Sequence, residues 1–131
     1  MKPGLYETLE RIAAVINARK GGDATKSYVA RLLAEDEDIF AFHDIRPQTP
    51  VHLLVIPKEH VGTLYEAGMA QHRALGKMLA LAGELARKEG ATDGFRIILN
   101  TGRVGHQEVY HVHMHILGGP EPLGSMLSRR K

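Results

Sequence analysis

Three histidines within a short apolar run are the residues of this sequence best suited to chemistry. His111, His113 and His115 alternate with apolar residues, and side chains two apart point to the same face of a β-strand. A strand predicted over Val109–Leu117 therefore carries the three imidazoles on one face. The other face carries the set that packs on the core: Tyr110, Val112, Met114 and Ile116. Because three buried ring N–H groups would need three partners, we predict a functional role for these histidines.

Two kinds of chemistry suit such a row of histidines. Histidine is a common zinc ligand, but three rings about 7 Å apart along a strand cannot all reach an ion at roughly 2 Å, although two could. The chain has no cysteine, and the carboxylates near the strand are few, Glu108 and Glu121. The alternative is attack by an imidazole on phosphorus, with a second imidazolium neutralising phosphoryl oxygens and protonating the leaving group. We favour this second chemistry and predict no metal and no cofactor.

Further candidates lie in two segments upstream of the triad strand. His52 stands in the otherwise apolar run 51–56 and is either a satisfied core residue or a partner that orients the triad. The segment from Phe42 to Ile45 is either an ordinary strand end or a nucleoside pocket. In the second case Phe42 and Ile45 flank the base and Asp44 accepts the ribose hydroxyls. The glycine-containing loop from Asn100 to Gln107 lets backbone N–H groups approach a phosphate, which alone is a weak indication.

The elements that must position these residues predict an α+β fold with an antiparallel sheet. Strands are expected over Ile39–His43, Val51–Ile56, Phe95–Leu99 and Val109–Leu117, the first two as a hairpin. A long helix is expected over Met69–Glu89, capped by Gly90 and directing Met78, Leu79, Ala82 and Leu85 inward. Helical spacing also marks residues 5–18 and a short helix over Ser27–Leu33, and the acidic run 35–38 is expected to be a solvated loop.

Length and composition bound the class of protein. The chain has 131 residues, 44% of them apolar and 24% charged, which fits one globular domain. The formal net charge is +2, and we interpret the basic end, Arg129–Lys131, as a solvated terminus rather than a nucleic-acid site. No apolar run approaches the roughly 18 residues of a membrane span, and charges interrupt the opening MKPGLYETLE, so no signal peptide is expected. We expect a cytoplasmic protein that binds neither membranes nor nucleic acid.

The motifs together resemble a known family. The run His111-Val-His-Met-His115-Ile-Leu resembles the motif of the histidine triad (HIT) family, and the following Gly118-Gly119 resembles its Hint branch, the purine nucleoside phosphoramidases. The similarity extends through residues 41–58, 94–100 and 105–110 and reaches Pro122-Leu-Gly124. It implies a HIT-like α+β fold for residues 34–131, the histidine-triad domain. It also implies a homodimer that acts on AMP or GMP conjugates.

The resemblance further implies a role for each site residue. His113 would be the nucleophile that attacks the α-phosphorus, while His115 and His111 bind phosphoryl oxygens and assist proton transfer and His52 supports them. Asp44 would hold the ribose hydroxyls. The other substrate contacts implied are Phe42, His43 and Ile45 around the base, and Asn100, Gln107, Glu108 and Val109 on the phosphate side. Glu108 stands where some members carry serine, and His106 replaces a frequent glycine.

Residues 1–33 depart from the family. They resemble the opening of phosphoribosyl-ATP pyrophosphohydrolase, an all-helical metal-dependent enzyme whose glutamate-bearing segments do not follow here. We interpret them as a non-catalytic helical N-terminal extension. The missing N-terminal segment of the family keeps an alternative open: a nucleotide-binding regulatory module without turnover. A metal-dependent hydrolase is a third possibility, which insensitivity to a chelator would argue against.

Overall fold

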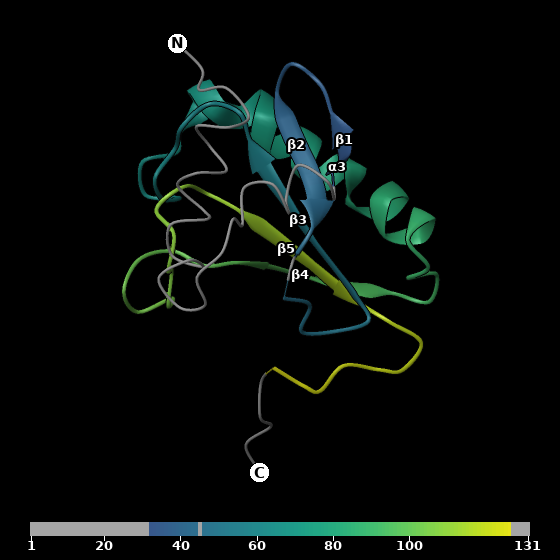
Figure 1. Ribbon diagram of the computed structural model, residues 1–131. Helices are drawn as coiled ribbons and strands as arrows, with labels where there is room; N and C mark the ends of the chain where they lie inside the picture. The colour runs from purple at the N-terminus through teal and green to yellow at the C-terminus, as the bar shows by residue number, and fades with distance from the viewer. Residues whose placement is uncertain (1–31, 45, 127–131) are drawn as a thin grey trace.

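The computed structural model describes residues 32–44 and 46–126 of the chain, which form an α+β fold (Figure 1). Five strands make one antiparallel sheet in the order β1-β2-β3-β5-β4. The strands are β1 (Leu32–Glu35), β2 (Ile39–His43), β3 (Val51–Pro57), β4 (Phe95–Leu99) and β5 (Met114–Gly118). A 3₁₀ turn, η1 (Met69–Gln71), leads into the long helix α3 (His72–Lys88). The predicted fold class is confirmed, as are the strands over Ile39–His43 and Phe95–Leu99.

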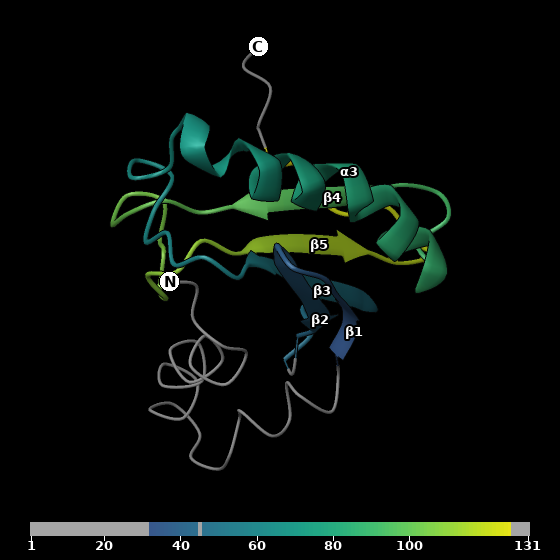
Figure 2. The ribbon, with the colours of Figure 1, turned by 90° about the horizontal axis from the view of Figure 1, so that it is seen from above.

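The sheet has two different faces because side chains alternate along each strand. Helix α3 lies across one face (Figure 2), and it buries there an apolar core made mostly of strand residues. Its members include Ile39, Ala41, Leu53, Val55, Met114 and Ile116 from the sheet and Met78, Ala82, Leu85 and Ala86 from the helix. The alternate positions, which include His52 and His115, lie on the opposite face.

Helix α3 begins and ends close to the predicted bounds. At its end, the Gly90 N–H donates to Arg87 O and the Ala91 N–H donates to Ala86 O, the pair of bonds that closes a helix at a left-handed glycine. Gly90 has the required positive φ of 101°, so its predicted capping role is confirmed. Leu79 was expected in the core but is 56% exposed, because the buried stripe of α3 is made by Met78, Ala82, Leu85 and Ala86.

The last strand is shorter than predicted. It begins at Met114, so residues 109–113 precede the regular ladder. Here the chain turns toward the loop after β3, and the Val112 N–H donates to Val61 O at 2.8 Å. Val112 is buried as expected, whereas Tyr110 is 54% exposed and does not join the core. The three histidines therefore do not share one straight strand face. Only His115 lies in β5, and His111 and His113 precede it.

The segment before β2 also differs from the expectation. Leu32 and Leu33, the last residues of the predicted short helix, lie in β1 and pair with β2. The other residues of the predicted extension, 1–31, lie outside the described part of the chain, so the extension and its boundary at residue 33 remain predictions. Within the described ranges, no helix is long and apolar enough to cross a membrane.

The acidic turn between β1 and β2 packs onto α3 instead of being a solvated loop. The Asp36 carboxylate accepts the N–H groups of Asp38 and Ile39 and so closes the turn. Asp38 is buried, and its carboxylate lies 2.6 Å from Lys77 Nζ and 3.0 Å from Arg73 Nε. The expectation is wrong because α3 presents two cations at the spacing of one helical turn.

Candidate active site

A buried pair of histidines from neighbouring strands forms the centre of the candidate site. His52 on β3 and His115 on β5 share the face opposite α3, and His52 Nε2 lies 2.9 Å from His115 Nδ1. The backbone N–H of Gln48 donates to His52 Nδ1 at 3.0 Å. In its neutral form His52 therefore carries its proton on Nε2 and donates it to His115 Nδ1. His115 in turn carries its own proton on Nε2.

Asp44 joins this pair from the end of β2. Its Oδ2 lies 3.4 Å from His52 Nε2, and its Oδ1 accepts the N–H of Arg46 at 2.8 Å, which fixes the carboxylate. Burial lowers the pKa of His52, and the negative charge of Asp44 opposes that shift. His52 is thus both a buried residue and a contact of the triad, which combines the two interpretations left open by the sequence.

His113 lies beside the pair and is oriented by the backbone. Its Nδ1 is 2.8 Å from the carbonyl oxygen of His111. Since a carbonyl only accepts, Nδ1 carries the proton and the neutral ring keeps a lone pair on Nε2. The rings of His113 and His115 meet edge to face, with centroids 5.1 Å apart. This geometry presents an unprotonated ring nitrogen next to a ring that carries an N–H.

The electrostatics of the site keep His115 neutral. Burial, followed by the neighbouring His113 and His52, lowers the pKa of His115 to about 4, while the carboxylate of Glu108 acts in the opposite direction. The free site therefore holds no imidazolium at this position at neutral pH, contrary to the charge pattern expected from the sequence. A bound phosphate would raise this pKa because an anion favours the protonated ring.

The His111 ring has different partners from the rings of His113 and His115. The side chain is fully buried, with Nε2 2.8 Å from Pro57 O and Nδ1 3.0 Å from Nδ1 of His60. This position does not support the expected contact between the His111 ring and a phosphoryl oxygen. His60 was not singled out from the sequence. The available signal was its place shortly after the predicted strand over Val51–Ile56, which carries His52.

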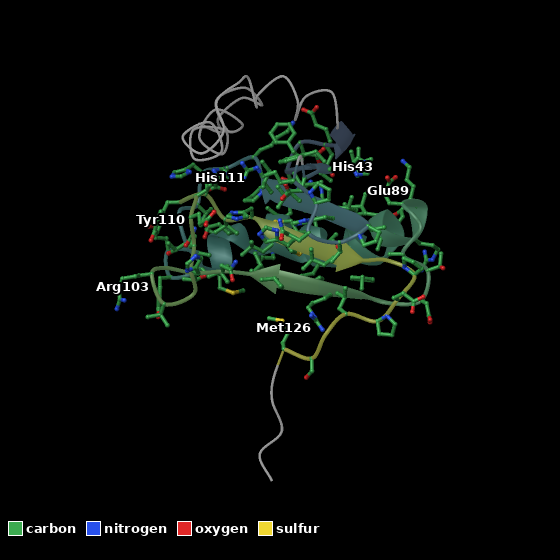
Figure 3. The ribbon with its side chains drawn as sticks, turned by 60° about the horizontal axis from the view of Figure 1, so that its bottom comes forward. His43, Glu89, Arg103, Tyr110, His111 and Met126 are labelled. Carbon is green, nitrogen blue, oxygen red and sulfur yellow. The ribbon has the colours of Figure 1, made fainter. Side chains whose placement is uncertain are left out.

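The residues expected around a base are divided between the two faces of the sheet. Phe42 pairs with Leu54 of β3, whose partner on β5 is His115, so these three side chains share one face. Phe42 is completely buried. His43 points the other way, and its Nε2 lies 2.8 Å from Glu89 at the end of α3 (Figure 3). Ile45 lies outside the described residues.

The loop between β4 and β5 contributes a rigid frame. Gln107 is buried, and its side chain accepts the Gly102 N–H and donates to Gly62 O and Val109 O. This amide therefore fixes the loop, and its expected contact with a substrate stays a prediction. Asn100 follows β4, and extending the pairing of Leu99 with Met114 by one residue places it beside His113.

His106 has a φ of 63°, a left-handed conformation that favours glycine. This value is compatible with the glycine that the family resemblance implies at this position. His106 is exposed, and its Nε2 lies 3.9 Å from the Glu108 carboxylate. Glu108 is therefore held at the rim of the loop, close enough to influence His115.

A metal is a poor match for the polar cluster. Among the described residues, one donor atom each of Asp44, His52 and His115 lies within 4.8 Å of the others. However, the His52 and His115 nitrogens face each other at hydrogen-bond distance, and the remaining His52 nitrogen already accepts the Gln48 N–H. The donor lone pairs that a cation would need are largely engaged by these hydrogen bonds.

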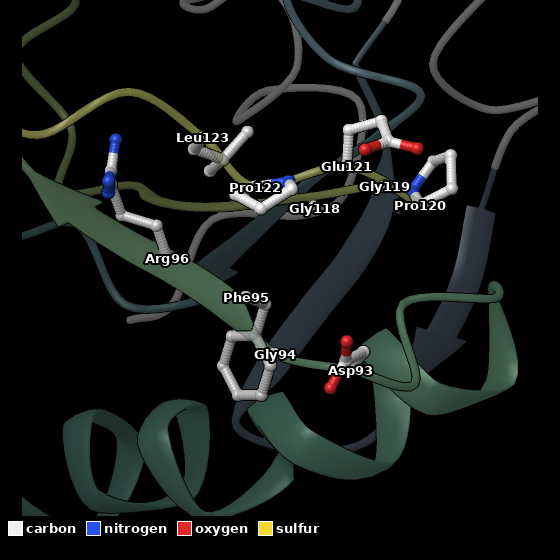
Figure 4. Close-up of a pocket in the computed structure, with 10 residues that line it drawn as sticks. All are labelled: Asp93, Gly94, Phe95, Arg96, Gly118, Gly119, Pro120, Glu121, Pro122 and Leu123. Carbon is white, nitrogen blue, oxygen red and sulfur yellow. The ribbon is translucent and has the colours of Figure 1, made fainter.

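A separate cavity of about 240 Å³ opens at the far end of β5 (Figure 4). It is lined by residues 93–96 and 118–123, with Asp93, Arg96 and Glu121 as its charged members. No histidine lines it, so its chemistry differs from that of the cluster around His113 and His115.

Comparison with known proteins agrees with this geometry. The family model described as the HIT domain matches residues 25–121. The chain belongs to the HIT family. It is 46% identical over 100 residues to the purine nucleoside phosphoramidase of Escherichia coli K12, a match covering 76% of this chain and 83% of that protein. It is 44% identical over 97 residues to the protein HitA of Neisseria gonorrhoeae, covering 74% of this chain and 91% of HitA. The predicted assignment to a Hint-type HIT hydrolase is confirmed.

Solved structures of the HIT family share the fold. A HIT family hydrolase from Clostridium thermocellum superposes with a TM-score of 0.70 at 30% identity, covering 88% of this chain and 96% of that one. One from Legionella pneumophila gives a TM-score of 0.66 at 43% identity, covering 70% of this chain and 82% of that one.

Proposed function

We propose that this HIT protein hydrolyses the P–N bond of purine nucleoside 5′-phosphoramidates, conjugates of AMP or GMP with an amine. The observation that carries the proposal is the hydrogen bond from His113 Nδ1 to His111 O. It leaves the Nε2 lone pair of His113 available for attack on phosphorus. The purine nucleotide class is supported by the name of the Escherichia coli relative.

The proposed reaction has two displacement steps. In the first, His113 Nε2 attacks phosphorus and the P–N bond of the substrate breaks. His115 binds a second proton at Nδ1 in the presence of the phosphate, as its hydrogen bond to His52 opens, and gives its Nε2 proton to the leaving amine. In the second, water attacks the same phosphorus, the bond to His113 breaks, and His115 takes the proton of the water. The products are an amine and a nucleoside monophosphate, and both histidines return to their initial states.

The cluster around His52 supports this proton transfer. His52 holds His115 Nδ1 at 2.9 Å, so the Nε2 of His115 is the atom left to exchange a proton with the substrate. Asp44, fixed by Arg46 N–H, has its second oxygen near His52. In our proposal this half-buried carboxylate beyond the end of β2 receives the ribose hydroxyls.

We also propose that the protein is a homodimer. The support comes from the family resemblance and from large apolar side chains that are exposed in the described structure. β4 is an edge strand, and Phe95 on β4 and Leu79 on α3 are large apolar side chains exposed at 40% and 56%. Sedimentation equilibrium checks this assembly: twice the mass of the chain is expected, and the mass of one chain would refute it.

The test of function is hydrolysis of AMP joined to a simple amine, followed with a chelator present. Wild type is expected to turn over, whereas His113→Ala is expected to lose at least about 1,000-fold in kcat while still binding AMP. His72→Ala, at an exposed histidine of α3, is the matched control and should keep full activity. Binding of AMP by an inactive wild type would instead support a nucleotide-binding module. Loss of activity with the chelator would favour a metal-dependent hydrolase.

A further inference from the structure

The buried His111 is the first element of this inference, because its hydrogen bonds assign its protons. Pro57 O accepts from His111 Nε2, so that nitrogen carries the proton. A second proton on Nδ1 would place a positive charge on a fully buried ring, which is costly. Nδ1 of His111 is therefore an acceptor, and the Nδ1 of His60, 3.0 Å away, is the donor. This donor is present whether His60 is neutral or protonated.

The loop that carries His60 is anchored by the two residues that precede it. The Lys58 N–H donates to Asp38 O at 2.8 Å, and Lys58 Nζ lies 2.8 Å from Glu35. On the next residue, the Glu59 carboxylate accepts from Gln71. His60 itself has an exposed side chain, but these contacts hold the chain directly before it. The ring can therefore act as a fixed support for His111.

The backbone of His111 needs such a support. Residues 111–113 precede β5, so the regular ladder does not hold them. The contacts described for this segment run instead to the end of β3 and the loop that follows it: His111 Nε2 to Pro57, His111 Nδ1 to His60, and Val112 N–H to Val61 O. The same segment supplies the carbonyl that fixes the proton of His113 on Nδ1.

We propose that His60 is a positioning residue for catalysis: it holds the His111 ring, and through the His111 carbonyl it keeps the Nε2 of His113 unprotonated. Without the His60 donor, the buried His111 Nδ1 loses this hydrogen bond, which costs free energy. The ring reduces that cost by turning or by moving its proton to the other nitrogen. Either change releases the Pro57 contact and shifts the carbonyl. His113 then populates the other tautomer, whose Nε2 is protonated and cannot attack phosphorus.

The consequence for kinetics rests on the proposed function. His60→Leu, which removes the donor but keeps an apolar side chain, is expected to lower kcat about 10- to 100-fold, the range typical of small misplacements of reacting groups. KM should change less than about threefold, because His60 does not touch the substrate in this proposal. His60→Asn retains an N–H donor near the position of Nδ1 and should recover most of kcat. His72→Leu, the same change at an exposed histidine, should have no effect.

A second measurement separates this inference from the reaction itself. The ¹⁵N spectrum of imidazole-labelled full-length protein reports which nitrogen of His113 carries the proton. Wild type and His60→Asn should show the Nδ1–H form, and His60→Leu a mixture of tautomers. An unchanged Nδ1–H form in a folded His60→Leu protein would overturn the inference, whatever its kcat. If wild type has no phosphoramidase activity, the proposed function fails, and the spectrum still decides the role of His60.

The role of His60 can be tested even if the His60→Leu protein does not fold. If His60→Leu does not fold, His60→Ala is used with free imidazole added to the solution, since the position is open to solvent. Restoration of the Nδ1–H form of His113 by imidazole supports the inference. Absence of any effect of the alanine substitution on the His113 tautomer overturns it.

Discussion

His111 and His113 are the same side chain two residues apart, yet the structure gives them opposite surroundings. His111 is fully buried with a partner on each ring nitrogen, whereas His113 is half-buried and uses its Nδ1 on a carbonyl. His115 differs again, because another histidine occupies its Nδ1 and burial lowers its pKa. At the residue scale, these different hydrogen-bond partners are the basis on which we propose one ring for support, one for attack and one for proton transfer.

A prediction at this scale concerns Glu108, the only described group whose charge raises the pKa of His115. Glu108→Gln removes that charge, so the pKa of His115 should fall below its value of about 4. An NMR titration of the His115 ring measures this shift. Glu121→Gln removes the same charge beyond the other end of β5 and should leave the titration unchanged. An equal shift in both variants would contradict the assignment to Glu108.

At the scale of elements, the turn between β1 and β2 is attached to α3 by charge. Asp38 is buried and contacts two cations of the helix, while the neighbouring Glu37 is 67% exposed and reaches Arg73 from the solvent side. The hairpin that ends in Asp44 is thereby fixed against the helix. The acidic turn thus contributes to the placement of β2, which carries one end of the candidate site.

The two acidic residues should differ in their effect on stability. Asp38→Asn removes a buried acceptor of charged hydrogen bonds, so the free energy of unfolding should fall by about 1–3 kcal/mol. Glu37→Gln, a surface change, should cost less than about 0.5 kcal/mol. Urea denaturation followed by circular dichroism measures both values. Equal losses in the two variants would mean that the buried position of Asp38 has no particular role.

At the scale of the whole molecule, the buried histidines link folding to pH. The pKa of His115 is about 4 in the folded state, whereas the ordinary pKa of histidine, expected in the unfolded chain, is 6.5. Between these values the unfolded chain binds the proton first, so protonation favours unfolding. The contribution of His115 is therefore complete above pH 6.5 and is lost as the pH falls to about 4. The lowered pKa of His52 acts in the same direction.

We expect the free energy of unfolding to fall between about pH 6.5 and pH 4, with His115 contributing about 2 kcal/mol of the loss. Urea unfolding at a series of pH values measures the slope. His115→Asn, which does not titrate, should show a shallower slope that retains the part due to His52. Identical slopes for the two proteins would show that His115 has the same pKa in both states.

The sequence by itself determined the α+β class, two strands to the residue, the capping glycine of α3 and the candidate set around His113. These features depend on local periodicity, backbone conformation and a motif contained in a few consecutive residues, all of which are written in the chain. The HIT assignment followed from the same short-range patterns and was confirmed by comparison.

The tertiary structure decided the surroundings of each histidine. The distance of 2.9 Å between His52 and His115 and that of 3.0 Å between His60 and His111 each join residues more than fifty positions apart. The inward turn of His111, the exposure of Leu79 and the docking of Asp38 depend likewise on distant elements. Burial and hydrogen-bond partners set both the tautomer and the pKa of an imidazole, and both exist only once the sheet has brought these segments together.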